Sequence, residues 1–116
     1  MSKDPAGWVI EYYSKARGDC PVIEYIASLS DQEQAKIDLY LRHLKDRGTE
    51  LGMPFARPVK GRKPLWELRP MPHRIVYFAF SGRRFVLLHA FRKGRMKKQR
   101  EHFDLAERRR QEIAGG

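Results

Sequence analysis

Three short apolar runs separated by turn residues form the centre of the chain. They cover residues 65–69, 74–80 and 84–91, with prolines after the first run and Ser81-Gly82 after the second. Each run has strand length and is rich in branched and aromatic residues, so the pattern predicts a three-stranded antiparallel meander. Gly82 can adopt a positive φ, which suits a hairpin loop.

The residues before the meander predict one strand and two helices. Residues 8–13 form an apolar strand candidate, and Pro21 suits the first turn of a short helix. Ser30 and Glu33 have the spacing of a capping box, which predicts that a second helix begins there and runs over residues 31–47. The apolar stripe of that helix is Ile37, Tyr40, Leu41 and Leu44. We expect the two helices to form a hairpin that packs on the sheet.

Two further segments complete the predicted fold. Residues 49–64 contain three prolines and two glycines and are predicted to form an irregular surface connector. Residues 97–113 are predicted to form a terminal helix with a weak apolar stripe, and Arg108 to Arg110 are expected to be solvated. The prediction is one α+β domain over residues 1–116, in which an N-terminal strand and a helical hairpin pack on an antiparallel sheet and a C-terminal helix follows.

Side chains on a strand alternate between its two faces, which predicts what each face of the meander carries. Trp66 and Leu68 should face the helices, so Glu67 and Arg69 should lie on the open face. In the third strand, strict alternation places Phe85, Leu87, His89 and Phe91 on one face.

Positive charge is concentrated on the meander and its exits. Residues 57–100 contain 14 lysines and arginines and a single acidic residue, Glu67, within a chain whose net charge is +10. Like charges held together on a folded surface repel each other. This concentration favours an anionic partner, as in proteins that bind nucleic acid.

Cysteine and histidine usage excludes several kinds of site. Cys20 is the single cysteine, so no internal disulfide can form, and the four histidines are scattered without zinc-ligand spacing. We expect no metal and no cofactor. The chain contains no apolar run that resembles a signal peptide or a membrane span. The expectation is therefore a soluble, cytoplasmic protein without a membrane partner.

Several motifs then carry a resemblance to a known family. They are Pro21-Val22 with Leu29, Leu51-Gly52 with Pro54, Leu65-Trp66-Glu67-Leu68-Arg69, Arg74-Ile75 with Tyr77, and Leu87-Leu88-His89 with Phe91 and Lys93. Together with the order of elements, they resemble the RelE/ParE superfamily of toxins from bacterial toxin–antitoxin pairs. The chain is most similar to the HigB-like, phage-derived branch, over roughly residues 8–113. It departs from that branch where a basic turn usually continues Lys-Thr-Pro, because residues 96–100 read MKKQR.

The resemblance implies a ribosome-dependent mRNA endonuclease that works without a metal. It also implies inhibition by a cognate helix-turn-helix antitoxin, similar to HigA, in a toxin–antitoxin hetero-oligomer. We expect the antitoxin to dock on the apolar open face of the meander, where acidic segments would complement the surrounding cations.

RNA cleavage without a metal requires proton transfers and stabilisation of a phosphorane, and cations can supply the stabilisation. We predict that Arg74 and Lys93 contact the scissile phosphate and that Arg69 orients the substrate. Glu67 could be a general base or a structural partner of the neighbouring arginines. His89 could be a general acid, although a histidine in an apolar strand is commonly a core residue.

Further basic residues are candidates for contacts with RNA or the ribosome. They are Lys60, Arg62, Lys63, Arg92, Arg95, Lys97, Lys98 and Arg100. Lys97 or Lys98 could also donate a proton. Two other classes of function stay open: a ParE-like toxin directed at DNA gyrase, and a non-catalytic relative that binds only nucleic acid or an antitoxin.

Overall fold

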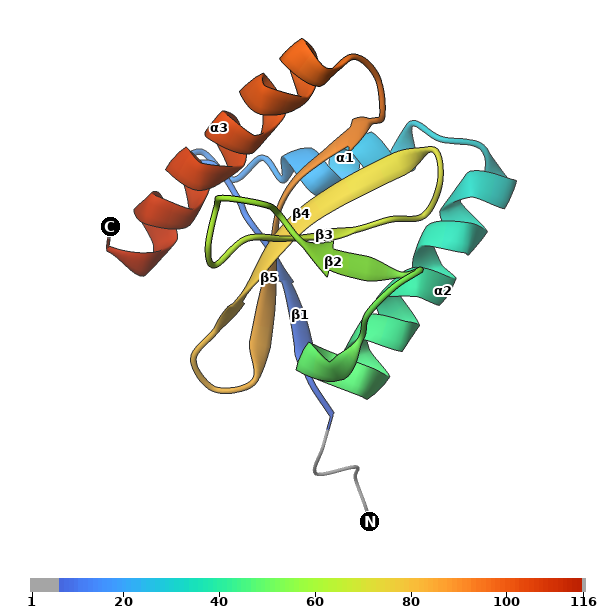
Figure 1. The fold of residues 1–116 in the computed structure, drawn as a ribbon, viewed down its shortest axis with the longest axis horizontal. Helices are drawn as coiled ribbons and strands as arrows, with labels where there is room; N and C mark the ends of the chain where they lie inside the picture. Colours follow the sequence, from blue (N-terminus) through green and yellow to red (C-terminus); the bar gives the residue numbers. More distant parts are fainter. Residues whose placement is uncertain (1–6, 116) are drawn as a thin grey trace.

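A five-stranded sheet forms the middle layer of the computed structural model, which describes residues 7–115 (Figure 1). Its strands are β1 (Val9–Tyr12), β2 (Ala56–Pro58), β3 (Trp66–Leu68), β4 (His73–Phe80) and β5 (Arg84–Arg92). They lie in the order β1-β5-β4-β3-β2. β1 pairs with β5 in parallel, and the other neighbours are antiparallel. The predicted α+β class and the β3-β4-β5 meander are confirmed.

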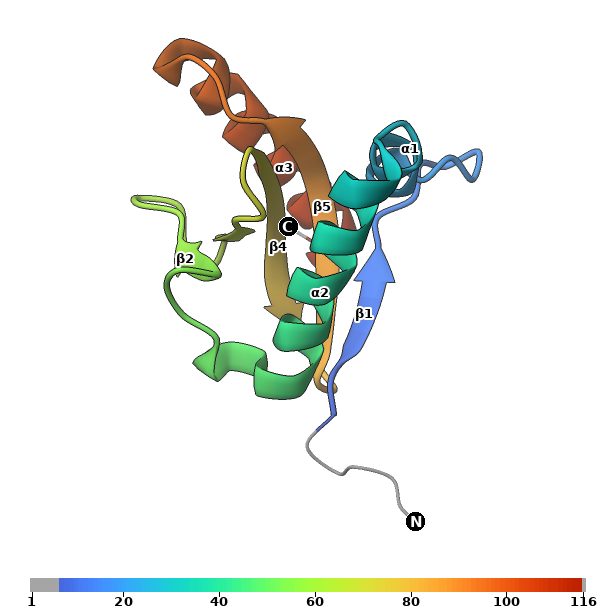
Figure 2. The same cartoon turned by 90° about the vertical axis from the view of Figure 1, so that its right-hand side faces the viewer.

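Helices cover both faces of this sheet. They are α1 (Pro21–Ala27), α2 (Asp31–Arg47) and α3 (Met96–Ala114), and a 3₁₀ turn, η1 (Gly48–Glu50), follows α2. In Figure 2, α2 crosses in front of the sheet and α3 lies behind it. None of the helices between residues 7 and 115 combines the length and the apolar character that crossing a lipid bilayer requires.

The ends of α2 form as the sequence predicts. The Ser30 hydroxyl accepts a hydrogen bond from the Glu33 amide at 3.2 Å, and the Glu33 carboxylate accepts one from the Ser30 amide at 3.3 Å. Gly48 ends the helix with a φ of +59°, a conformation that suits glycine. The Trp8 indole packs against Gly48 and leaves no room for a Cβ there. The helix is therefore stopped by both backbone conformation and packing.

Two hydrophobic cores lie on opposite sides of the sheet. The residues buried under α1 and α2 include Val22, Ile37, Leu44, Leu68, Ile75, Tyr77, Phe85 and Leu87. Those buried under α3 include Leu65, Val76, Phe78, Val86, Leu88, Phe91 and Ala106. The second core corrects one expectation, because α3 covers much of the face that we expected to be open for an antitoxin.

The connector is more ordered than its composition predicts. It contains β2, in which Ala56 pairs with Leu68 and Arg57 pairs with Glu67. The prediction of an irregular segment is wrong here. Ala-Arg-Pro carries little strand propensity, and proline is tolerated because β2 lies at the edge of the sheet.

A β-bulge changes which side of β5 faces α3. His89 lies opposite Val76 and Leu87 lies opposite Tyr77, so Leu88 is an extra residue without a partner of its own. The alternation resumes one residue out of step, and both His89 and Phe91 lie on the α3 side. The predicted placement of these two side chains with Leu87 is therefore wrong.

Arg109 is buried, contrary to the expectation that residues 108–110 are solvated. Its exposed fraction is 8%, its guanidinium donates to the Leu88 carbonyl at 2.9 Å, and it lies over the Tyr13 ring. A bulge leaves a backbone carbonyl that must find a donor outside the regular ladder. Arg109 supplies that donor and attaches α3 to the centre of the sheet.

Candidate functional site

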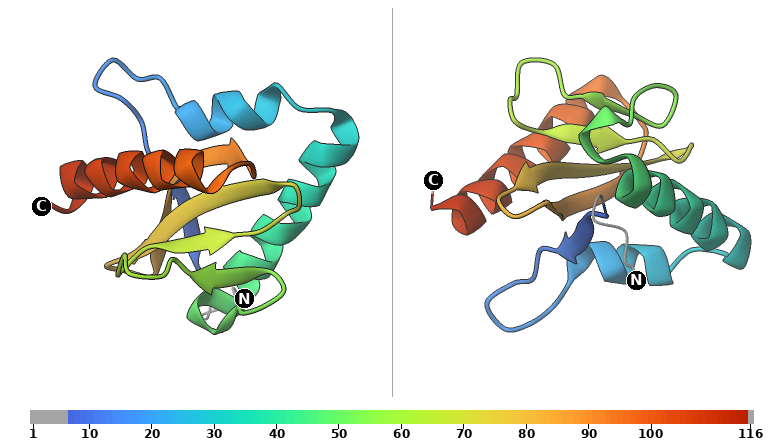
Figure 3. Two further views of the ribbon diagram at one scale, coloured as in Figure 1. Left: turned by 45° about the horizontal axis from the view of Figure 1, so that its top comes forward. Right: turned by 90° about the horizontal axis from the view of Figure 1, so that it is seen from below.

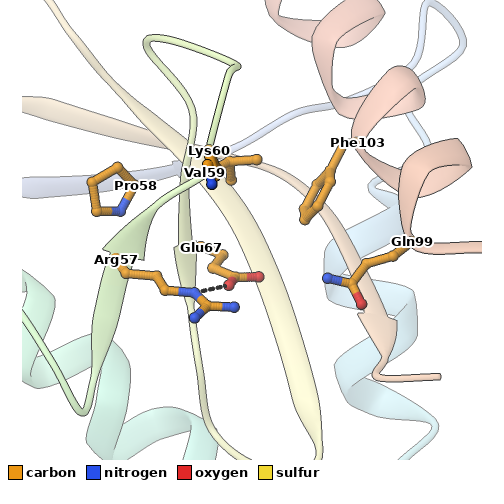
Figure 4. A pocket seen from close by; sticks show the side chains of 7 residues that line it. All are labelled: Arg57, Pro58, Val59, Lys60, Glu67, Gln99 and Phe103. Atoms are coloured by element: carbon orange, nitrogen blue, oxygen red, sulfur yellow. Dashed lines mark hydrogen bonds and ion pairs between the residues drawn. The ribbon is translucent and has the colours of Figure 1, made fainter. Parts of the chain in front are cut away.

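A pocket of about 280 Å³ lies between the β2–β3 hairpin and the first turns of α3 (Figure 4). Its lining residues are Arg57, Pro58, Val59, Lys60 and Glu67 from the hairpin, and Gln99 and Phe103 from α3. Arg62, in the loop of the hairpin, forms an ion pair with Asp104 of α3 at 2.7 Å. Figure 3, right, shows this loop beside α3. The ion pair therefore joins the two walls of the pocket.

The register of the sheet explains why these groups meet. Arg57, Glu67, Val76 and His89 lie directly opposite one another across β2, β3, β4 and β5. Neighbouring strands are only about 5 Å apart. The side chains of Arg57, Glu67 and His89 therefore lie in one row across the sheet, on the face that α3 covers.

Glu67 is the centre of a cluster of arginines. Its carboxylate accepts from Arg57 Nε at 2.6 Å and lies 3.6 Å from Arg74 Nε. The Glu67 and Arg74 side chains are almost fully buried, whereas that of Arg57 is 45% exposed. Glu67 therefore occupies the position of a structural partner of arginines, one of the two roles that the sequence left open.

Arg74 is not on an open surface, which corrects its predicted placement. It has no exposed area, and its guanidinium donates to the His73 carbonyl at 3.1 Å and to the Met71 sulfur at 3.0 Å. Burial, followed by the positive charge of Arg69, lowers the pKa of Arg74. The central position of β4 and the Met71 side chain together hide the guanidinium.

Arg69 has a similar environment. Its guanidinium donates to the sulfur of Met53 at 3.3 Å, and Met53 and Met71 are both exposed. Thioether sulfur is a weak acceptor. Each of Arg69 and Arg74 is therefore covered by a flexible side chain that a stronger acceptor could displace.

The cluster holds more positive charge than its acid neutralises. Arg57 and Arg74 both pair with Glu67, and the charge of Arg69 acts on Arg74 in addition. Among residues 7–115, Arg69 Nε and Arg74 Nη2 are buried without a hydrogen-bond partner, and Arg74 Nε makes only the ion pair with Glu67 at 3.6 Å. Unpaired buried donors and excess buried charge are costly. Such an arrangement is typical of a functional site that receives an anion.

His89 belongs to a network that attaches α3 to the sheet. Its Nε2 lies 2.8 Å from His102 Nδ1, and Arg109 lies 3.4 Å from its Nδ1. Because a guanidinium can only donate, His89 Nδ1 must accept and its Nε2–H must donate to His102. Burial, then the charges of His102 and Arg109, lower the pKa of His89 to about 4. The geometry gives this imidazole a structural role, since its one N–H is already used.

Arg92 is the last residue of β5 and Lys93 follows it, and the two residues have different neighbours. The Lys93 amide donates to the Pro72 carbonyl at 2.8 Å, which places this exposed residue beside the turn that carries Met71. Arg92 lies 3.8 Å from Glu33 of α2, away from the pocket. The structure therefore places Lys93 near the arginine cluster and directs Arg92 toward the helical hairpin.

The other predicted RNA contacts surround the pocket unevenly. Lys60 lines it directly, and Arg62 is engaged by Asp104. The remaining predicted contacts are exposed on the hairpin or near the start of α3: Lys63, Arg95, Lys97, Lys98 and Arg100. Among residues 7–115, no group of three or more histidine, cysteine, aspartate or glutamate side chains is arranged to hold a metal ion.

Sequence reasoning missed five of the seven pocket residues, among them Arg57, Gln99 and Phe103. Arg57 was seen only as part of a basic connector, and its pairing with Glu67 depends on β2, which was not predicted. Gln99 and Phe103 lie one turn apart on α3. Their helical spacing was visible in the sequence, but the sheet position that they face was not.

The structure defines a small α+β protein with a cationic site beside a pocket. Residues 24–111 match the model of a family described as phage derived protein Gp49-like (DUF891). The chain belongs to this Gp49-like family, which is part of the RelE/HigB-type toxin group. No curated protein matches the chain significantly.

Proposed function

We propose that this chain is the toxin of a toxin–antitoxin pair, of the HigB branch, and that it cleaves mRNA on the ribosome without a metal. The observation that carries the proposal is the cluster of Arg57, Arg69 and Arg74 around one buried carboxylate. Donors without partners beside a solvent-accessible pocket are suited to bind the phosphate oxygens of RNA.

How each arginine can bind a phosphate depends on how exposed its guanidinium is. Arg57 is partly exposed and can turn from Glu67 toward a phosphate in the pocket, beside Lys60. Arg69 and Arg74 become available when a phosphate oxygen replaces the sulfur atoms of Met53 and Met71, because a charged oxygen is the stronger acceptor.

Preorganised cations supply the main catalytic effect in this proposal. During RNA cleavage the 2′-hydroxyl loses its proton to water, the 2′-oxygen attacks phosphorus, negative charge builds up on the phosphorane, and the bond to the 5′-oxygen breaks. The guanidinium groups gathered around Glu67, once they bind the phosphate, stabilise that charge. Lys93, together with Lys97 or Lys98, is exposed near the site and supplies the proton for the leaving oxygen.

The proposed partner is a helix-turn-helix antitoxin in a hetero-oligomer with this chain. Because α3 covers much of the sheet face, we expect an acidic antitoxin segment to bind the cationic mouth of the pocket instead. Such binding would neutralise the charge that attracts RNA.

Induced expression in a bacterium, with primer extension on a reporter mRNA, tests the proposal. Wild type should arrest growth and produce cuts that depend on translation. Arg57→Ala combined with Lys93→Ala should abolish both. The matched control is Lys15→Ala with Arg17→Ala, which removes the same charge from an exposed loop and should leave both intact. Circular dichroism checks that each variant is folded.

Two results would overturn the proposal. Growth arrest without mRNA cuts would point to a gyrase-directed toxin and lead to supercoiling assays. Absence of both arrest and cuts, from a folded wild-type protein, would leave a binding module without nuclease activity.

A further inference from the structure

We propose that the pocket between the β2–β3 hairpin and α3 holds one nucleobase of the RNA, and that Glu67 and Gln99 select a base with an exocyclic amino group. The inference rests on the proposed function, because it specifies which part of an RNA substrate enters this site. In it, Glu67 and Gln99 contact the base, a role that phosphate binding alone does not require of them.

The size and the walls of the pocket suit a flat ring. Its volume of about 280 Å³ equals roughly nine water molecules at about 30 Å³ each, which is the scale of a single base. Figure 4 shows the Phe103 ring on one side and Pro58 with Val59 on the other. Single-stranded RNA is commonly bound by stacking its bases on aromatic side chains. The pocket offers such a surface together with an apolar opposite wall.

Glu67 supplies a carboxylate oxygen that makes an ion pair but accepts no hydrogen bond from the described residues. Its Oε2 atom receives the hydrogen bond from Arg57, whereas Oε1 is buried and has no hydrogen-bond partner among residues 7–115. The nearest charged atom described for Oε1 is Arg74 Nε, at 3.6 Å. In Figure 4, the carboxylate oxygen of Glu67 that does not bond Arg57 points toward the amide of Gln99 across the pocket. A base that enters between them meets a carboxylate acceptor at its edge.

The acceptor determines which bases fit. A carboxylate accepts hydrogen bonds and cannot donate them. Adenine, cytosine and guanine each present an amino group with two N–H donors at the Watson–Crick edge, whereas uracil presents a single N3–H donor there, flanked by two carbonyl oxygens. The amide of Gln99 has both a donor and an acceptor and can bond either neighbour of that amino group. Uracil is disfavoured because its one donor, N3–H, brings a carbonyl oxygen on each side toward the Glu67 carboxylate, whereas an amino group brings a second N–H.

The surroundings of the pocket place the rest of the nucleotide. Lys60 and the exposed guanidinium of Arg57 lie on the hairpin side, where they can bind the phosphate attached to the base. The Arg62–Asp104 ion pair holds the hairpin loop to α3 and so sets the width of the pocket. Base, phosphate and pocket width are thus controlled by different residues and can be tested separately.

The test is an NMR titration of the purified full chain with AMP, CMP, GMP or UMP. Changes in amide and side-chain chemical shifts measure the affinity and locate the binding site. We expect each amino-bearing nucleotide to bind about tenfold more tightly than UMP, the size of one discriminating base contact. The shifts should centre on Gln99 and Phe103. Glu67→Gln should remove most of the preference, and Gln99→Leu should weaken binding of the amino-bearing nucleotides. Gln111→Leu, an exposed change on the same helix as Gln99, should preserve both.

Each outcome supports or overturns the inference. Equal binding of all four nucleotides, binding of none, tightest binding of UMP, or shifts remote from the pocket would overturn it. If Glu67→Gln or Gln99→Leu fails to fold, the wild-type series alone decides. mRNA cutting without a nucleotide preference would overturn only this inference. A nucleotide preference without cutting would overturn only the proposed nuclease.

Discussion

Acidification should destabilise this protein through His89. The folded state holds this imidazole neutral, because Arg109 faces its Nδ1 and its Nε2–H is engaged by His102. Unfolding releases it to the ordinary histidine pKa of 6.5, compared with about 4 in the folded state. Below pH 6.5 the unfolded chain binds a proton that the folded chain does not, so stability is lost as the pH falls from 6.5 to 4.

The magnitude follows from the two pKa values of His89. The difference between 6.5 and about 4 corresponds to at most about 3 kcal/mol, at 1.36 kcal/mol per pH unit. Since the side chain is only half-buried, solvent screening reduces the expected effect to about 1–2 kcal/mol. The contribution is complete above pH 6.5 and absent below pH 4.

Urea unfolding of wild type and His89→Gln between pH 7.5 and pH 4 measures this effect. Glutamine can donate to His102 but does not titrate. We therefore expect the wild-type free energy of unfolding to fall by about 1–2 kcal/mol more than that of the variant. The lowered pKa of Glu33 also destabilises the fold in acid, but it affects both proteins equally. Parallel curves for the two proteins would refute the reasoning, as would an NMR titration midpoint of His89 near 6.5.

Three other substitutions test how the helices are held, all by urea unfolding at pH 7.5. Arg109→Ala should lower the free energy of unfolding by about 2–3 kcal/mol, because it removes the donor to the bulge carbonyl, whereas the exposed Arg108→Ala should change it by less than about 0.5 kcal/mol. Gly48→Ala should cost about 2 kcal/mol or more, since its φ is positive and the neighbouring indole fills the Cβ position. Gly52→Ala, where a Cβ meets nothing, should change stability little. Arg95→Asp should add about 1 kcal/mol, because Arg95 caps α3 without a side-chain hydrogen bond; equal stability of variant and wild type would contradict this.

Local signals were sufficient to predict most of the fold. The capping box at Ser30 and Glu33 marks the start of α2 within a single turn, and a helix end needs only its own neighbours. The meander strands were likewise predicted from short apolar runs bounded by proline and glycine. In each case, the residues that determine the structure lie within a few positions of one another.

The candidate site could be predicted only in part, because its geometry depends on contacts between distant segments. Glu67 and Arg74 were identified as candidates, but their burial follows from the cover that α3 and Met71 supply. Arg57 was missed because β2 forms only by pairing with β3. The bulge at Leu88 also has no local sequence signal, although one extra residue is enough to change the face of every side chain that follows.

The electrostatics of the first turn of α3 are consistent with a site that favours anion binding over stability. The N-terminal end of a helix carries partial positive charge and is usually stabilised by acidic residues. Here the first turn contains no acidic residue, and its N-cap is a basic side chain without a capping bond. Lys97 and Lys98 add further positive charge at the same end, next in the chain to Gln99, which lines the pocket. A surface arranged only for stability would place carboxylates there, so the excess charge is best explained by an anionic ligand that neutralises it when bound.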